Sequence, residues 1–350
     1  MITDDRRPLK LAVDRLQAAA AARASGDFAD AVNAVLAALP QSDRRDASDA
    51  VPRLAKLLPD TPVWLQGMVA VITGACVELG ADPAVCAPVI LDSARDAVRR
   101  AAEFPAIWAA AGGGALPVPQ SVDPSAEAID QLGGASAGEE ALLGLMAWWQ
   151  VQQWELATVA MLSHRPIRDG LAERAQFRAE AERLALVGPY PLESMRHIVR
   201  MVDDEPMLVL HRPSGTAYRM RMGGLGDNRQ LLTLLADTLV GGGHVPGVAP
   251  HPAAVGLARD TPFGPGTNPP SANVSAQFAL ANPDGTLIDP EGCPDDITFT
   301  DGIRFLVLDA PRTPLTWTAG RLFPVVSGSL VLDAVLSPEE SRTWAAKASH

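Results

Sequence analysis

A glycine-rich turn is the segment in which this sequence comes closest to a small-ligand site. Gly223-Gly224-Leu225-Gly226-Asp227-Asn228 lies between an expected strand and an expected helix. Backbone N–H groups at the start of a helix can hold an anion in that arrangement. The turn has neither the lysine of a P-loop nor the spacing of a dinucleotide-binding fingerprint. A structural interpretation stays open, because Asn228 is a good helix N-cap and glycines permit a tight turn.

The strands that precede this turn supply side chains for the same site. His211 lies on one expected strand, and Arg219 and Arg221 alternate with apolar residues on the next. The predicted ligand-binding set is His211, Arg219, Arg221, Gly224, Gly226, Asp227 and Asn228. A small anionic ligand fits the charge of this set. No motif in the sequence identifies a cofactor.

A second motif, Gly134-Ala135-Ser136-Ala137-Gly138, matches the GxSxG pattern of the nucleophile elbow in α/β-hydrolases. The elbow requires a strand before the serine, and residues 125–132 do not have a strand pattern. Ser136 and Glu139 also have the spacing of a capping box, which explains both residues without catalysis. Catalytic residues are therefore not assigned, and the sequence leaves open whether the chain is an enzyme.

The six histidines show no metal-ligand spacing such as HExxH. His244 and His251 could join Cys293 or Asp295 around a metal, but nothing in the sequence fixes that geometry, so we predict no metal site. Glu155 lies among tryptophans, where a buried carboxylate would have a raised pKa and could act as an acid or base. We expect an arginine partner for Glu155 instead.

The composition argues against nucleic acid and membrane as partners. The chain has 350 residues and a net charge of −12, without a basic run. The uncharged stretch 61–77 is short for a membrane span. With 47% hydrophobic and 20% charged residues, the chain has the profile of a globular protein. Three cysteines without paired spacing and the absence of a signal-peptide pattern predict a cytoplasmic location.

The first part of the chain is rich in alanine and has helical periodicity. Helices are expected at 8–24, 28–39, 50–58, 63–79, 84–102 and 139–163, followed by two shorter helices up to Val202. Gly26-Asp27-Phe28-Ala29-Asp30-Ala31 resembles the turn of a tetratricopeptide hairpin. This resemblance covers one hairpin, Pro40 comes early for that family, and no second copy follows at its period of about 34 residues. An ordinary helical hairpin is the alternative.

Near Asp203 the pattern changes from helical to β-like. Strands are expected at 207–212, 216–222, 277–281, 286–288, 303–308 and 325–332, with a helix over 229–240 and a last helix opened by a capping box at Ser337. The predicted fold class is α+β: a helical bundle or array followed by a mixed, mainly antiparallel module. The predicted domains are a helical region 1–110, a linker 111–124, helices 125–204 that pack on the C-terminal module, and the module 205–350 with a long Pro/Gly-rich loop at 244–275.

We therefore expect a soluble intracellular interaction or scaffold protein, with another protein as its partner. The alternative is an enzyme or small-ligand binder, with its site at the seam between the helical part and the turn 223–228. An enzyme requires a pocket with convergent polar groups, whereas an interaction protein requires an exposed apolar surface or groove.

Overall fold

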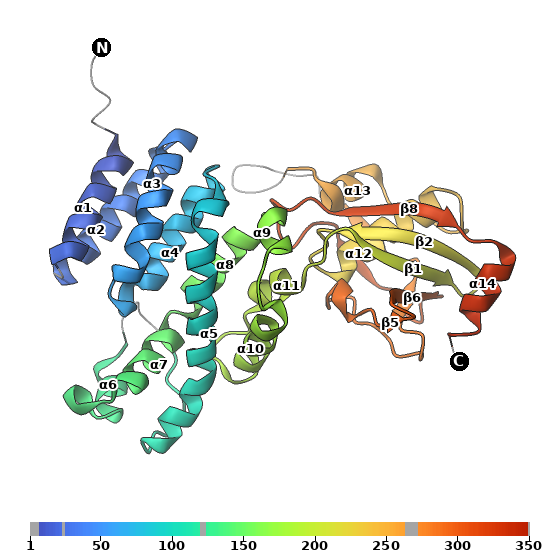
Figure 1. The fold of residues 1–350 in the computed structure, drawn as a ribbon. Coiled ribbons are helices and arrows are strands. Elements are labelled where there is room, and N and C mark those ends of the chain that lie inside the picture. The colour runs from blue at the N-terminus through green and yellow to red at the C-terminus, as the bar shows by residue number, and fades with distance from the viewer. Residues whose placement is uncertain (1–6, 23–24, 120–123, 263–271, 349–350) are drawn as a thin grey trace, which may run out of the picture. The chain divides into compact units, whose positions relative to one another are not determined.

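The computed structural model describes residues 7–22, 25–119, 124–262 and 272–348. The chain divides into two compact units, Met1–Val199 and Arg200–His350, which we call the helical unit and the α+β unit (Figure 1). The predicted α+β fold class is confirmed, because helices are followed by a mixed sheet. Among the described residues, no helix is both long and apolar enough to cross a membrane.

The helical unit is a stack of helices that pack through buried apolar residues. Helix α1 packs on α2 and α3, α3 packs on α4, α4 packs on α8, and α5 packs on α7, α8 and α10. The helices are α1 (Pro8–Ala22), α2 (Ser25–Ala38), α3 (Arg44–Leu57), α4 (Val63–Glu78), α5 (Ala87–Ala110), α6 (Ala126–Gln131), α7 (Glu139–Trp149), α8 (Val151–Leu162), α9 (Arg165–Asp169), α10 (Arg174–Val187) and α11 (Glu193–Arg200). Helices α7, α8 and α10 follow the expected linker in the chain, and they pack on α4 and α5, which precede it.

The segment expected to be a linker is held by side chains of the helical unit. Trp148 Nε1 donates to the carbonyl of Pro117 at 2.8 Å, and Trp108 Nε1 donates to that of Ala115 at 3.2 Å. Tyr190 donates its hydroxyl to the carbonyl of Pro119 at 3.1 Å. Residues 120–123 lie outside the described residues.

The single long helix expected over 139–163 was wrong, because the chain turns at Gln150 between α7 and α8. The side chain of Gln150 binds the first turn of α4: its amide nitrogen donates to the carbonyl of Val63, and its oxygen accepts from the N–H of Gly67, both at 2.8 Å. The apolar periodicity continues across the break, and therefore the sequence gives no sign of it.

The α+β unit contains a sheet in the order β4-β6-β1-β2-β8, with β5 also paired to β6. Its strands are β1 (Glu205–His211), β2 (Thr216–Gly223), β4 (Ala279–Ala281), β5 (Phe299–Thr300), β6 (Ile303–Asp309) and β8 (Ser329–Val335). Among the described strands, only the pairing of β1 with β6 is parallel, so the sheet is mixed and mainly antiparallel as expected. Strands β3 (Asn273–Ser275) and β7 (Thr316–Thr318) form a separate pair.

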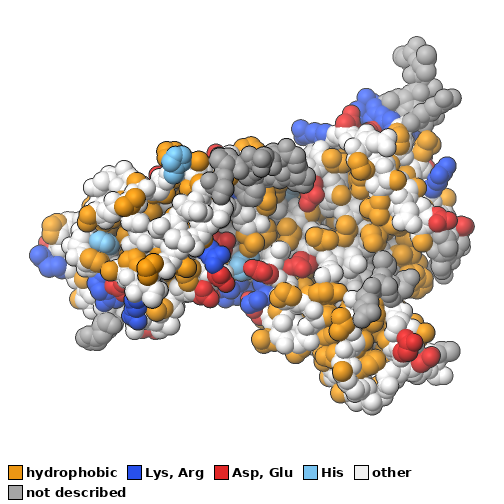
Figure 2. All heavy atoms as spheres, turned by 180° about the vertical axis from the view of Figure 1, so that it is seen from behind, with side chains coloured by type: hydrophobic (Ala, Val, Ile, Leu, Met, Phe, Trp, Pro, Cys, Tyr) orange, Lys and Arg blue, Asp and Glu red, His pale blue; other side chains and the backbone are white. Residues whose placement is uncertain are grey.

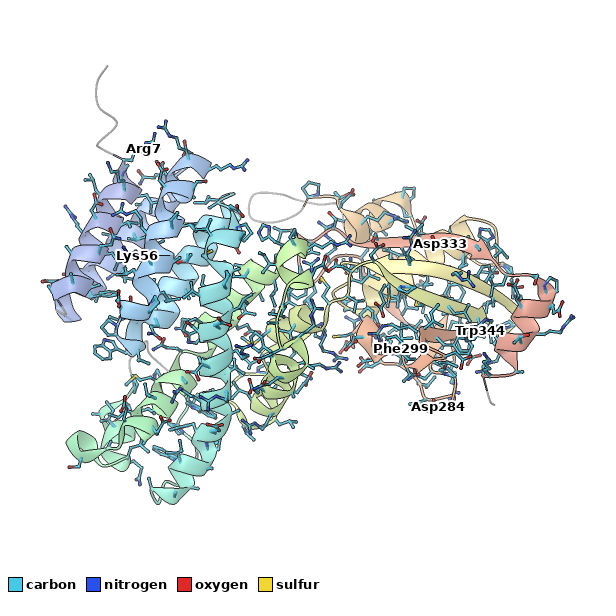
Figure 3. The ribbon with its side chains drawn as sticks, in the orientation of Figure 1. Arg7, Lys56, Asp284, Phe299, Asp333 and Trp344 are labelled. Carbon is cyan, nitrogen blue, oxygen red and sulfur yellow. The ribbon has the colours of Figure 1, made fainter. Side chains whose placement is uncertain are left out.

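Each face of the main sheet has its own apolar core. On one face, Tyr218, Met220 and Met222 pack with residues of α12 (Asn228–Leu235) and α13 (Pro252–Arg259). On the other face, Phe305 packs edge-on against Trp344 of α14 (Pro338–Ala345), with ring centroids 5.2 Å apart (Figure 3). The expected alternation in β2 is confirmed, because Arg219 and Arg221 are exposed between buried neighbours.

The stretch 244–275 was expected to be a long loop, and this was wrong in part. It contains α13 and β3, while residues 263–271 lie outside the described residues. His251 caps α13 by accepting a hydrogen bond from the N–H of Ala253 at 3.1 Å, with Pro252 in the first helical position. The capping box at Ser337, in contrast, is confirmed at the start of α14.

Candidate functional site

The glycine turn is held in place by internal hydrogen bonds. The N–H of Gly224 donates to the carbonyl of Val202 at 3.1 Å, and that of Gly226 donates to Gln230 Oε1 at 2.8 Å. Gly224 has φ of +66°, and a Cβ placed there would lie 2.2 Å from the carbonyl oxygen of Ser327. These glycines are therefore required by the close packing of the turn, and ligand binding by it stays a prediction.

The expected N-cap of the following helix was wrong by one residue. Asp227 is the N-cap of α12, and its carboxylate accepts from the N–H of Gln230 at 2.7 Å. Asn228 is fully buried, its N–H donates to the carbonyl of Gly292 at 2.9 Å, and its Nδ2 donates to that of Asp289 at 2.8 Å. Asn228 thus fastens the start of α12 to the loop 289–292, and its Oδ1 has no partner among the described residues.

The strand register separates His211 from the turn. His211 pairs with Thr216 at the hairpin end, whereas Gly223 lies at the opposite end of β2. At about 3.3 Å per residue, the two ends are roughly 23 Å apart. His211 is 8% exposed, its Nδ1 lies 2.8 Å from Ser214 Oγ, and its ring contacts Phe278 edge-on. Burial lowers the pKa of His211, which favours the neutral imidazole.

The two predicted arginines lie on the face of the sheet opposite α12. Arg221 forms two hydrogen bonds of 3.1 Å with the carboxylate of Asp333 on β8 (Figure 3). Arg219 is exposed, two residues away on the same face. The turn holds Gly224, Gly226, Asp227 and Asn228 close together because they are neighbours in the sequence. His211 lies at the other end of the strand pair, far from the turn.

The serine motif lacks the geometry of a nucleophile elbow. Ser136 is exposed in a short 3₁₀ turn, and helix α6 precedes it where the elbow requires a strand. The expected capping box was also wrong, because Gly138 is the N-cap of α7 and makes no side-chain cap.

Glu155 has a backbone partner in place of the expected arginine. Its Oε1 accepts a hydrogen bond from the N–H of Met195 at 3.1 Å, at the start of α11. Burial raises the pKa of Glu155, while the amides of Met195 and Ser194 act in the opposite direction. A carboxylate at a helix N-terminus is stabilised by the exposed N–H groups there, so this residue has a structural role. Among the described residues, no group of three or more His, Cys, Asp or Glu side chains is arranged to hold a metal.

A polar cavity of about 440 Å³ lies among α4, α5, α7 and α8. Its charged side chains pair within the helical unit, Asp96 with Arg100 at 2.8 Å and Asp92 with Arg95 at 3.2 Å. Gln150 uses its amide group to join α4 to the break between α7 and α8. The polar side chains that line this cavity thus bind one another and neighbouring helices, which is a structural role.

A second hollow, which we call the helical groove, is mainly apolar. It has a volume of about 330 Å³ between α5, α9 and α10 and is lined by Ala87, Pro88, Leu91, Ile167, Leu171 and Phe177. Phe177 and Leu91 are buried, whereas Pro88 is exposed. Val85, beside the groove in sequence, is 48% exposed. Figure 2 shows hydrophobic side chains over much of the helical unit on the face drawn there.

The rim of the helical groove carries acids and arginines that form ion pairs. Arg95 is shared between Asp92 at 3.2 Å and Glu173 at 2.5 Å. Asp169, at the end of α9, pairs with Arg165 at 3.3 Å. This groove is not evident from the sequence, because its two walls, residues 84–95 and 166–177, are far apart in the chain and each has an ordinary amphipathic pattern.

A third hollow, which we call the sheet-edge pocket, lies within the α+β unit beside the edge strand β4. It has a volume of about 380 Å³, and apolar side chains form most of its wall. Arg312, Thr313 and Asp289 are its polar residues.

Comparison with known proteins finds no matching family model, no similar curated protein and no similar solved structure.

Proposed function

We propose that this chain is a protein-interaction protein, and that its helical groove binds an apolar segment of a partner protein flanked by basic residues. The observation that carries this proposal is the apolar groove between helices on a chain whose net charge is −12. Apolar grooves between helices are a recurring docking surface for partner segments. A cytoplasmic location belongs to the same proposal, supported by Cys76 and Cys86, which are buried and form no disulfide among the described residues.

Burial of apolar side chains and electrostatic attraction contribute to this binding in different ways. Each apolar anchor that becomes fully buried contributes about 1.5–3 kcal/mol, before the cost of ordering the segment is subtracted. The acids Asp92, Asp169 and Glu173 are already paired with arginines, so the charge that favours an approaching basic segment is the net charge of −12 of the whole chain. Charge of this kind acts mainly on the association rate and on the choice of partner, and salt weakens it.

Two designed peptides of equal length test the proposal. One carries leucine and lysine at the spacing of an amphipathic helix, and the other carries leucine and glutamate. Fluorescence anisotropy is expected to show binding of the lysine peptide, which weakens with added salt, and little binding of the glutamate peptide. Hydrogen exchange is expected to show protection in residues 84–95 and 166–177.

A groove-filling variant distinguishes the groove from the acidic surface in general. Ala172 lines the groove and is exposed, so Ala172→Trp occupies the groove without disturbing the core. Ala179→Trp, on an exposed position of α10 outside the lining, is the matched control. We expect Ala172→Trp alone to abolish binding of the lysine peptide. Equal binding by both variants would show that the groove is not the docking surface.

A further inference from the structure

The sheet-edge pocket lies wholly within the α+β unit and is independent of the helical groove. Its wall is formed by α12, by β4 with the residue before it, and by the segments 287–290 and 311–315. Phe278, Leu280 and Ile288 are buried at its base, while Leu287 is 50% exposed. At about 380 Å³ the pocket is within the size range of small-molecule sites, which are mostly apolar with a few polar groups.

The polar residues of the pocket differ in whether they already have hydrogen-bond or ion-pair partners within the protein. The carboxylate of Asp289 accepts a hydrogen bond from the N–H of Glu291 at 2.9 Å, and its carbonyl accepts from Asn228 Nδ2 at 2.8 Å. The nearby Arg212 is paired with Asp309 at 2.8 Å. Arg312 is exposed, and among the described residues its guanidinium has no ion pair or hydrogen-bond partner.

A guanidinium that has no partner in the described part of the chain, beside an apolar hollow, favours a ligand with one anionic end and one apolar end. Arginine binds carboxylates through two parallel N–H···O bonds, and the hydroxyl of Thr313, which also lines the pocket, can donate a further bond. The apolar wall requires a hydrocarbon part, because burial of apolar surface supplies most of the binding free energy in such a site.

We propose that the sheet-edge pocket binds a small amphipathic carboxylate, a molecule with a medium-length hydrocarbon chain and one terminal carboxylate group. The carboxylate lies on Arg312 and Thr313 at the surface. The hydrocarbon chain lies against Phe278, Leu280 and Ile288. This binding does not depend on the helical groove, and either site can exist without the other.

Three probes of eight carbon atoms each test the charge requirement: octanoate, 1-octanol and octylamine. Isothermal titration calorimetry of the full chain is expected to show that octanoate binds most tightly and octylamine least tightly. Arg312→Gln is expected to weaken octanoate binding by about tenfold or more, the range for loss of a charge-assisted hydrogen bond. The effect of Arg312→Gln on the affinity for 1-octanol is expected to be small. Binding of 1-octanol by the variant also tests that the variant is folded.

Arg342→Gln is the matched control, because it removes the same charge from an exposed position on α14, outside the pocket lining. It is expected to leave octanoate binding unchanged. Leu287→Ala removes an exposed part of the apolar wall and is expected to weaken octanoate and octanol alike. The proposal is overturned if octanoate does not bind, if octylamine binds equally well, or if Arg342→Gln and Arg312→Gln have the same effect.

Discussion

Gln150 and Gly67 are joined by a hydrogen bond in which the N–H of Gly67 donates to the side-chain oxygen of Gln150 at 2.8 Å. The amide nitrogen of the same side chain donates to the carbonyl of Val63, also at 2.8 Å. One side chain thus satisfies a donor and an acceptor in the first turns of α4, at the residue where the chain leaves α7 and enters α8. The approach requires glycine, because a Cβ at position 67 would lie 2.6 Å from that oxygen.

Gly67→Ala is therefore expected to destabilise the helical unit by about 1–3 kcal/mol, the usual cost of inserting an atom into a packed contact. Urea denaturation followed by circular dichroism measures the change. Gly144→Ala is the control, because its Cβ would meet the flexible end of Ile107 at 3.3 Å and the substitution improves helix propensity. Equal losses in the two variants would contradict a tight contact at Gln150.

Alanine substitutions at Gly215 and Gly224 distinguish the cost of backbone strain from the cost of a steric clash. Gly224 and Gly215 have φ of +66° and +65°, but only Gly224 has a close neighbour, the Ser327 carbonyl oxygen 2.2 Å from a Cβ placed there. Gly215→Ala is expected to cost about 1–2 kcal/mol from backbone strain alone. Gly224→Ala is expected to cost clearly more, as measured by thermal unfolding of both variants. Similar losses would show that the turn can move away from Ser327.

Local patterns were sufficient to predict most elements of this fold. The alternation of Tyr218, Met220 and Met222 with two arginines predicted β2 and its buried face, and the spacing of Ser337 and Glu340 predicted the start of α14. These features depend on residues that are neighbours in the sequence. Periodicity and capping rules describe that range of interaction well.

The errors occurred where a distant residue decides between locally similar arrangements. The break at Gln150 depends on Gly67, 83 residues away, and the shift of the N-cap from Asn228 to Asp227 accompanies the bond from Asn228 to Asp289, 61 residues away. Asp and Asn are about equally good N-caps, so propensity could not separate them. The two hollows used in our proposals are formed by distant segments in the same way, and the sequence therefore did not reveal them.

Glu155 provides a test of the cost of a buried charge. Because burial raises its pKa, the folded helical unit favours the neutral carboxyl, and ionisation reduces stability as the pH rises through the pKa values of the unfolded and folded states. Glu155→Gln keeps an acceptor for the N–H of Met195 without the charge. We expect this variant to be at least as stable as the wild type at pH 7, with a difference that shrinks as the pH falls toward 4.5.

Glu155→Ala supplies the comparison for that prediction. It removes the acceptor and leaves the N–H of Met195 unbound at the start of α11, which is expected to cost about 1–3 kcal/mol. Chemical denaturation at several pH values measures both variants. If glutamine destabilises the unit as much as alanine does at pH 7, the negative charge itself is required at the helix start.

His211 leads to a pH dependence of the opposite sign in the α+β unit. Burial lowers its pKa below the ordinary value of 6.5, so the unfolded chain takes up a proton before the folded chain does. The contribution of neutral His211 to stability is therefore complete above pH 6.5 and is lost as the pH falls through the pKa of the folded state. His211→Asn keeps a polar group near Ser214 Oγ and does not titrate. We expect unfolding measurements between pH 8 and pH 5 to show a smaller acid-induced loss of stability in this variant, and an unchanged loss would assign the acid sensitivity to other groups.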